Sequence, residues 1–159
     1  MNSGTSQPGP LRLALLAGIV IALLFVLFGL PLPATLPKTN LLTGAHAPES
    51  VTALFARSCQ DCHSDNTVWP WYDRVAPLRW YMKRDVERAR VALNLSAWES
   101  YPKERQIEYL KTFDLVARKH QMPPPAYILG HRYQGLSEKD HQLLDEWTRK
   151  EGERLMAAR

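Results

Sequence analysis

The most informative segment of the sequence is Cys59-Gln-Asp-Cys62-His63, which contains both cysteines of the 159-residue chain. Two residues separate the thiols, and a histidine follows the second thiol directly. This is the spacing for covalent attachment of c-type haem, because both sulfurs can reach the two vinyl groups from the same side of the porphyrin. The adjacent imidazole can bind the iron as an axial ligand. The sequence therefore predicts a single covalent haem c on Cys59 and Cys62, with His63 on the iron.

Two other uses of paired cysteines fit the sequence less well. A structural zinc site needs two further ligands, normally from a second paired motif, and the remaining histidines lack the usual spacing. A thioredoxin-like dithiol expects a βαβ context, which the sequence does not have. Two cysteines also make at most one bridge, which excludes a disulfide scaffold. Haem c is the favoured interpretation of the three.

The sixth iron ligand is less sharply indicated than the fifth. Met122 opens the run Met122-Pro-Pro-Pro125, a rigid extended loop that could hold a thioether in a fixed position. A methionine sulfur on the iron raises the reduction potential relative to a second histidine. We predict Met122 as the ligand, with His120, His131 or an open position as the alternatives.

Aromatic residues follow the cysteine motif closely. Trp69, Trp71 and Tyr72 come shortly after His63, and Trp80 comes a little later. Large aromatic side chains around a haem exclude water and thereby tune its potential. We predict that these four residues contribute to the haem pocket.

The amino-terminal part contains a long apolar run. No charged or strongly polar side chain occurs from Leu13 to Leu30, and at about 1.5 Å per residue such a helix can cross the bilayer core. Pro31 and Pro33 then end the helix. A cleaved signal peptide is the alternative, but no small-x-small cleavage site follows directly. We expect an uncleaved anchor, and Arg12 on its amino side predicts that the rest of the chain lies outside the cytoplasm.

The predicted organisation has four parts. Residues 1–12 form a short cytoplasmic segment, 13–32 the transmembrane anchor, 33–48 a proline-containing linker and 49–159 the c-type haem-binding domain. In a bacterium this places a single-pass protein in the inner membrane with the haem domain on the periplasmic side.

The domain is expected to be all-α. Apolar spacing and helix punctuation predict four helices, and alternating strand patterns are absent. They cover Glu49–Ser58, Leu78–Leu93, Pro102–Lys119 and Ser137–Met156. The stretches 64–77 and 120–136 are rich in proline, glycine and aromatic residues and are expected to be ordered loops. The third helix is expected to align Ile107, Leu110, Asp114 and Ala117 on one face.

Length and charge narrow the function classes. The chain is too short for a large enzyme with separate cofactor and substrate domains. With 20 basic and 16 acidic residues, the net charge of +4 is too mild and too mixed for a nucleic-acid partner. Five tryptophans, six tyrosines and four phenylalanines suit a pocket for a large apolar ligand.

The pattern as a whole resembles the haem-binding domain family of small bacterial cytochrome c-like proteins over residues 49–150. The matching residues are Cys59-Gln-Asp-Cys62-His63-Ser64, Trp69-Pro70-Trp71-Tyr72, Ala76-Pro77-Leu78, Trp80, Asp85-Val86, Arg90, Asn94-Leu95-Ser96-Ala97-Trp98, Met122-Pro123, Tyr127, Leu136-Ser137 and Trp147. The resemblance implies an all-helical fold related to class I cytochromes c, covalent haem, His63 as one axial ligand and Met122 as the other. The family usually has glycine where this chain has Ala89.

Three functions are compatible with these features. The first is a membrane-tethered cytochrome that exchanges electrons with a redox partner protein or membrane complex, either respiratory or photosynthetic, without being an enzyme. The second is a haem-based sensor, and the third is a peroxidase. The last two need an open or displaceable sixth position on the iron.

Overall fold

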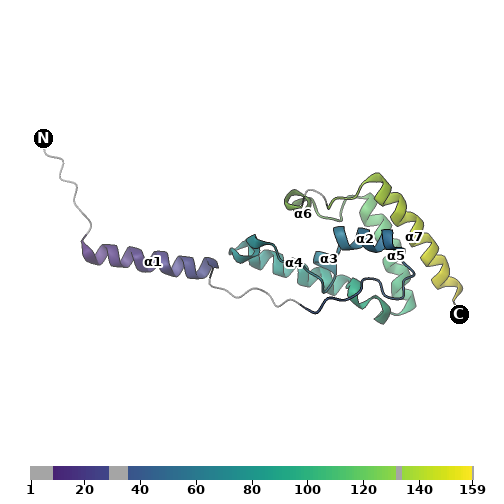
Figure 1. Cartoon of the computed structure of the whole chain (residues 1–159), viewed down its shortest axis with the longest axis horizontal. Helices are drawn as coiled ribbons and strands as arrows, with labels where there is room; N and C mark the ends of the chain where they lie inside the picture. Colours follow the sequence, from purple (N-terminus) through teal and green to yellow (C-terminus); the bar gives the residue numbers. More distant parts are fainter. Residues whose placement is uncertain (1–8, 29–35, 132–133, 159) are drawn as a thin grey trace. The chain divides into compact units, whose positions relative to one another are not determined.

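The computed structural model describes residues 9–28, 36–131 and 134–158, and every regular element in these ranges is a helix. The predicted all-α class is confirmed. The residues divide into two units, Met1–Ala34 with Pro70–Lys83 and Thr35–Trp69 with Arg84–Arg159. The elements drawn in Figure 1 are α1 (Pro10–Phe28), α2 (Glu49–Ser58), α3 (Gln60–His63), η1 (Trp71–Arg74), α4 (Leu78–Ala92), η2 (Leu95–Ser100), α5 (Lys103–Arg118), α6 (Pro125–Gly130) and α7 (Glu138–Ala157).

The four helices expected in the domain are present as α2, α4, α5 and α7, with ends within one residue of the prediction. The two stretches expected to be loops also contain short helices. η1 lies in the first stretch, and α6 begins after the proline run in the second. Pro125 is the first residue of α6. Proline is tolerated there because a backbone N–H in the first turn of a helix has no acceptor within the helix.

The start of α7 shows how local chemistry fixes these boundaries. The Ser137 hydroxyl accepts a hydrogen bond from the Asp140 N–H, and the Asp140 carboxylate accepts one from the Ser137 N–H at 2.8 Å. This reciprocal arrangement is a capping box, which satisfies two N–H groups that the helix leaves unpaired. Arg57 also lies 2.9 Å from the Asp140 carboxylate and joins the end of α2 to the start of α7.

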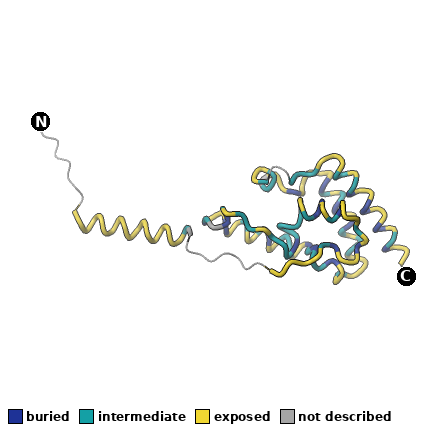
Figure 2. The backbone as a smooth tube through the Cα atoms, in the orientation of Figure 1, coloured by how far each residue is buried: buried dark blue, intermediate teal, exposed yellow. Residues whose placement is uncertain are grey.

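The core of the second unit is aromatic and lies between α2, α5, α7 and η2. The Phe113 ring meets Phe55 edge-on at 5.1 Å between centroids and stacks on Trp98 at 6.0 Å and Trp147 at 6.2 Å. Figure 2 shows the buried residues concentrated on the inward sides of these helices. The face of α5 differs from the expected one, because Phe113 is buried whereas Asp114 is half-buried and pairs with Arg118.

The segment before α2 packs against this core. Leu42 and Ala45 are buried, and the Leu42 N–H donates to the Leu95 carbonyl at 3.0 Å. A turn with a positive φ of 81° at Gly44 lets the chain fold back there. The packed structure therefore includes residues that the sequence assigns to the linker.

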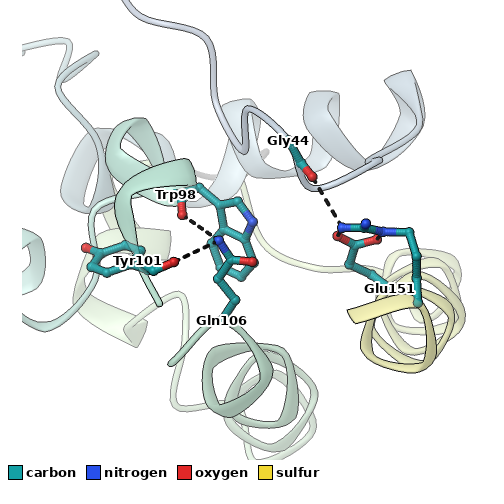
Figure 3. A network of polar contacts seen from close by, with 6 residues as sticks. Gly44, Trp98, Tyr101, Gln106 and Glu151 are labelled. Carbon is teal, nitrogen blue, oxygen red and sulfur yellow. Dashed lines mark hydrogen bonds and ion pairs between the residues drawn. The ribbon is translucent and has the colours of Figure 1, made fainter. Parts of the chain in front are cut away.

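Polar contacts at the edge of the core hold the turn and η2 in place (Figure 3). The Gln106 amide of α5 donates to the Trp98 and Tyr101 carbonyls at 3.0 and 3.1 Å. Arg154, which pairs with the buried Glu151, donates to the Gly44 carbonyl at 3.4 Å. The contacts to Gly44 and Tyr101 satisfy backbone carbonyls, and the contact to Trp98 adds a second donor to a carbonyl that already accepts the Tyr101 N–H.

In the first unit, α1 is the apolar helix. The segment Pro10–Leu27 has a mean hydropathy of 2.5 and is long and apolar enough to span a membrane. A signal sequence can have the same length and apolar character. Pro31 and Pro33, which are predicted to end the helix, lie outside the described residues.

Candidate functional site

The cysteine motif forms a single tight turn at the end of α2. The helix stops at Ser58, and Cys59 has a φ of −129°, so the chain changes direction before α3 begins. The N–H groups of Cys62 and His63 both donate to the Cys59 carbonyl, at 3.3 and 3.0 Å. The turn therefore holds two thiols and an imidazole together within five residues.

The His63 ring is oriented by the last turn of α4 and the residue that follows it. Its Nδ1 lies 3.1 Å from the Ala89 carbonyl and 3.1 Å from the Leu93 carbonyl. Because a carbonyl oxygen can only accept, Nδ1 carries the proton and Nε2 keeps its lone pair. Burial lowers the pKa of His63, although both carbonyls oppose this effect. The imidazole is therefore neutral near pH 7, with one nitrogen free to bind a metal.

The two cysteines are half-buried free thiols. Burial raises the pKa of the Cys59 thiol to about 12 and that of the Cys62 thiol to about 11. Coulombic interaction with Cys62 adds to the shift of the Cys59 pKa, and interactions with Asp61 and Asp85 add to that of the Cys62 pKa. Both side chains therefore remain protonated at neutral pH and are weak nucleophiles in the folded chain.

Two cavities adjoin the motif. The first has a volume of about 230 Å³, and apolar side chains of α2, α5 and the segments after α4 and α5 form most of its wall. The second has a volume of about 370 Å³ and extends toward α4 and α6. The residues that line both cavities are Cys59, His63, Ala92, Met122 and Pro123. The thiols, the imidazole and the thioether therefore face the same hollow.

The three candidate sixth ligands differ in whether they line the cavities beside His63. Met122 lines both cavities, with 42% of the residue exposed. Neither His120 nor His131 lines either cavity. His120 is exposed, and its ring lies edge-on to His141 at 6.0 Å. The His131 ring stacks on Tyr127 at 4.2 Å.

The aromatic residues expected in the pocket are not among those that line the cavities. Trp69 is half-buried in the second unit, outside both cavity walls. Trp71, Tyr72 and Trp80 belong to the first unit, where Trp71 is 79% exposed and meets Tyr72 edge-on at 5.8 Å. Their role beside a haem stays a prediction.

The aromatic and apolar wall that the structure does provide comes mainly from α5. Tyr109, Thr112, Phe113 and Val116 line the first cavity. Spacings of three and four residues place these side chains on one face of the helix. This face is adjacent to the one predicted from the sequence. The carbonyls that orient His63 belong to the backbone and carry no sequence signal.

The loop after the motif is anchored by Arg90 of α4. Its guanidinium donates to the Ser64 carbonyl at 2.8 Å and to the Thr67 hydroxyl at 2.7 Å. The Asp65 N–H donates to the Ser96 hydroxyl at 3.0 Å. These contacts fix the motif on both sides, because α2 precedes it and this loop follows it.

The family model of the haem-binding domain matches residues 18–150 of the chain. The chain belongs to the haem-binding domain family. The match starts within α1, earlier than the 49–150 of the sequence resemblance. Searches of curated proteins and of solved structures gave no match.

Membership of this family indicates that the chain is a haem protein. The residues around the cavities fit haem. Haem is a flat apolar ring that needs an apolar cavity and a nitrogen or sulfur ligand on its iron. The first cavity is lined mostly by apolar side chains, and Nε2 of His63 is left free by the hydrogen bonds of Nδ1. Two thiols stand beside that imidazole.

Proposed function

We propose that this protein is a membrane-anchored monohaem c-type cytochrome that transfers electrons. Cys59 and Cys62 would hold the haem through thioether bonds, with His63 and Met122 as axial ligands. The main support for the proposal is the His63 ring, whose Nδ1 is held beside both thiols by the Ala89 carbonyl of α4 and the Leu93 carbonyl just after it. Such a contact fixes the tautomer and the direction of the metal-binding nitrogen.

When bound, haem supplies reversible one-electron exchange between ferrous and ferric iron. The tasks of the chain are then to hold the iron and to exclude water. The α5 side chains exclude water from the first cavity, and the neutral His63 needs no proton change to act as a ligand. No acid–base or nucleophilic group is required for this function, so we propose an electron carrier rather than an enzyme.

Met122 is proposed as the sixth ligand because, of the three side chains considered, it alone lines the cavities together with His63. A second function has one observation in its favour. Met122 is 42% exposed, and a sulfur that leaves the iron would open a position for a gas or a peroxide. A haem-based sensor or a peroxidase-like protein is therefore the alternative that an experiment has to exclude.

The apolar helix α1 would tether the haem domain to a membrane, with Arg12 on the cytoplasmic side. In a bacterium this places the domain in the periplasm, near a redox partner or a membrane complex. Tethering raises the local concentration of the haem beside such complexes. Protease added to intact spheroplasts should cleave the haem domain, and a protected domain would contradict this topology.

The attachment is tested by extraction of the full-length haem-loaded protein with acid–acetone. We expect the haem to remain with the polypeptide, and its reduced pyridine complex to have the spectrum of a porphyrin without vinyl groups. Cys59→Ser and Cys62→Ser should each leave one vinyl group free. Extraction of the haem from the parent protein would contradict covalent attachment.

The sixth ligand is tested by carbon monoxide binding to the reduced protein. We expect slow binding to the parent, fast binding to Met122→Ala, and slow binding to the matched controls His120→Gln and His131→Gln. The oxidised parent should also show the charge-transfer band of a methionine–iron bond. Fast binding to the parent would favour the sensor or peroxidase instead.

A further inference from the structure

We propose that Tyr127 is a positioning residue that holds the Met122 loop in place through a hydrogen bond to Asp61 of the haem-attachment motif. The inference rests on the proposed function, in which the Met122 sulfur binds the iron. It assigns a role to one of the two residues between the cysteines, which the attachment chemistry itself does not use.

The contact joins two parts of the chain that are distant in sequence. The Tyr127 hydroxyl donates to Oδ2 of Asp61 at 2.8 Å and also contacts the side-chain amide of Gln134. Tyr127 lines the second cavity together with Cys62 and Met122. The contact therefore bridges the turn that carries the thiols and the loop that carries the thioether.

The Asp61 end of the bridge is fixed. Its Oδ1 accepts the Val68 N–H at 3.1 Å, and its backbone carbonyl accepts the Thr67 hydroxyl at 2.7 Å. The side chain therefore cannot turn away without giving up a second hydrogen bond. Hydrogen bonds to a charged carboxylate are stronger than those between neutral groups.

Tyr127 is connected to Met122 by a stiff segment of the chain. Three consecutive prolines, Pro123 to Pro125, lie between the two residues, and proline fixes φ near −65°. The Tyr127 N–H donates to the Pro124 carbonyl at 2.9 Å and closes the first turn of α6. A stiff segment of this kind moves as a unit with the tyrosine.

Met122 has little other support. In the part of the chain that the structure describes, its backbone N–H makes a single long hydrogen bond of 3.4 Å, to the Val116 carbonyl. The residue is 42% exposed, so packing covers only part of it. On its amino side the Gln121 N–H donates to the Val116 carbonyl at 2.9 Å, and on its carboxyl side Pro123 is buried. The bridge between Tyr127 and Asp61 adds to these contacts and limits how far the α6 end of the loop can move from the cavity.

The test uses the full-length haem-loaded protein and the variants Tyr127→Phe, Asp61→Ala and Asp61→Asn. In Asp61→Asn the amide can donate to the phenol oxygen while the phenol donates to Gln134, so this variant keeps the bridge. Tyr101→Phe is the matched control, because it removes a phenol oxygen that accepts the Asn94 N–H at 2.9 Å, far in sequence from the Met122 loop.

We expect Tyr127→Phe and Asp61→Ala to retain covalent haem, to weaken the methionine–iron band and to bind carbon monoxide about tenfold faster than the parent. The double variant Tyr127→Phe with Asp61→Ala should be no faster than either single variant, because both remove one contact. Asp61→Asn and Tyr101→Phe should stay within about twofold of the parent.

Two results overturn the inference. One is a carbon monoxide rate in Tyr127→Phe equal to that of the parent, and the other is an equal acceleration in Tyr101→Phe. If Tyr127→Phe does not accumulate, the comparison of Asp61→Ala with Asp61→Asn decides with the same measurement. The proposed function fails separately, in the parent protein, when haem is extractable or carbon monoxide binds fast without any substitution.

Discussion

Removal of haem should cost the second unit a large part of its free energy of unfolding. The perturbation is Cys59→Ser with Cys62→Ser, which keeps the side-chain size but removes both attachment points. An apolar cavity in a protein core destabilises it by about 24 cal/mol per Å³. For the 230 Å³ of the first cavity, this gives about 5.5 kcal/mol.

The mouth of the cavity is open to water, so part of its wall is hydrated when haem is absent, and we expect a loss of about 3–5 kcal/mol. Small domains have a total stability of roughly 5–15 kcal/mol. The haem-free variant should therefore be close to unfolding at room temperature. Its helical content should fall at a much lower urea concentration than that of the parent.

The assay is urea unfolding followed by far-ultraviolet circular dichroism, with the absence of haem in the variant checked by its absorption spectrum. Met122→Ala is the control, because it loses an axial ligand but keeps the haem in the cavity through both thioether bonds. We expect it to lose no more than about 2 kcal/mol. A haem-free variant within about 1 kcal/mol of the parent would contradict this expectation, since filling the cavity would then contribute almost nothing to stability.

Three further predictions concern the scaffold of the site. Phe113→Ala, which opens the centre of the aromatic core, should lower the free energy of unfolding by about 3–5 kcal/mol in urea titrations. Gln106→Leu should cost about 1–3 kcal/mol in the same assay, because it removes the donor to the Tyr101 carbonyl and one of the two donors to the Trp98 carbonyl. Asp140 is partly desolvated, which raises its pKa, but hydrogen bonds from Ser137 and Arg57 outweigh this and lower the pKa overall. The stabilisation by this carboxylate is therefore complete above about pH 4 and is lost as the pH falls through the lowered pKa, so Asp140→Asn should differ from the parent at pH 7 but not in strong acid.

The features that could be predicted from the sequence depend on neighbouring residues. The four main helices begin and end within a residue of the prediction because proline and capping residues act within one turn. The cysteine motif is similarly local, and its five residues fold into one turn at the end of α2. The match of the family model to residues 18–150 agrees with the family resemblance found in the sequence.

The features that escaped prediction depend on contacts between distant residues. Ile107, Leu110 and Ala117 of the predicted face do pack in or against the core, but Asp114 does not. The centre of the core is Phe113, because the rings of η2, α2 and α7 meet there. Leu42 and Ala45 look like linker residues, yet they are buried against η2 and the core. Periodicity identifies an apolar face but does not say which neighbouring element it meets.

The same distinction separates the two proposed axial ligands. His63 follows the thiols in the sequence, but the nitrogen that can bind iron is determined by the Ala89 and Leu93 carbonyls, 26 and 30 residues away. Met122 is near His63 only because α5 and the proline loop bring it to the same cavities. A ligand held by backbone hydrogen bonds and a covalent neighbour is difficult to displace, whereas a half-exposed ligand on a loop depends on whatever limits that loop. Changes in the reactivity of this protein should therefore arise first on the methionine side, and the hydroxyl of Tyr127 is the group whose removal should reveal them.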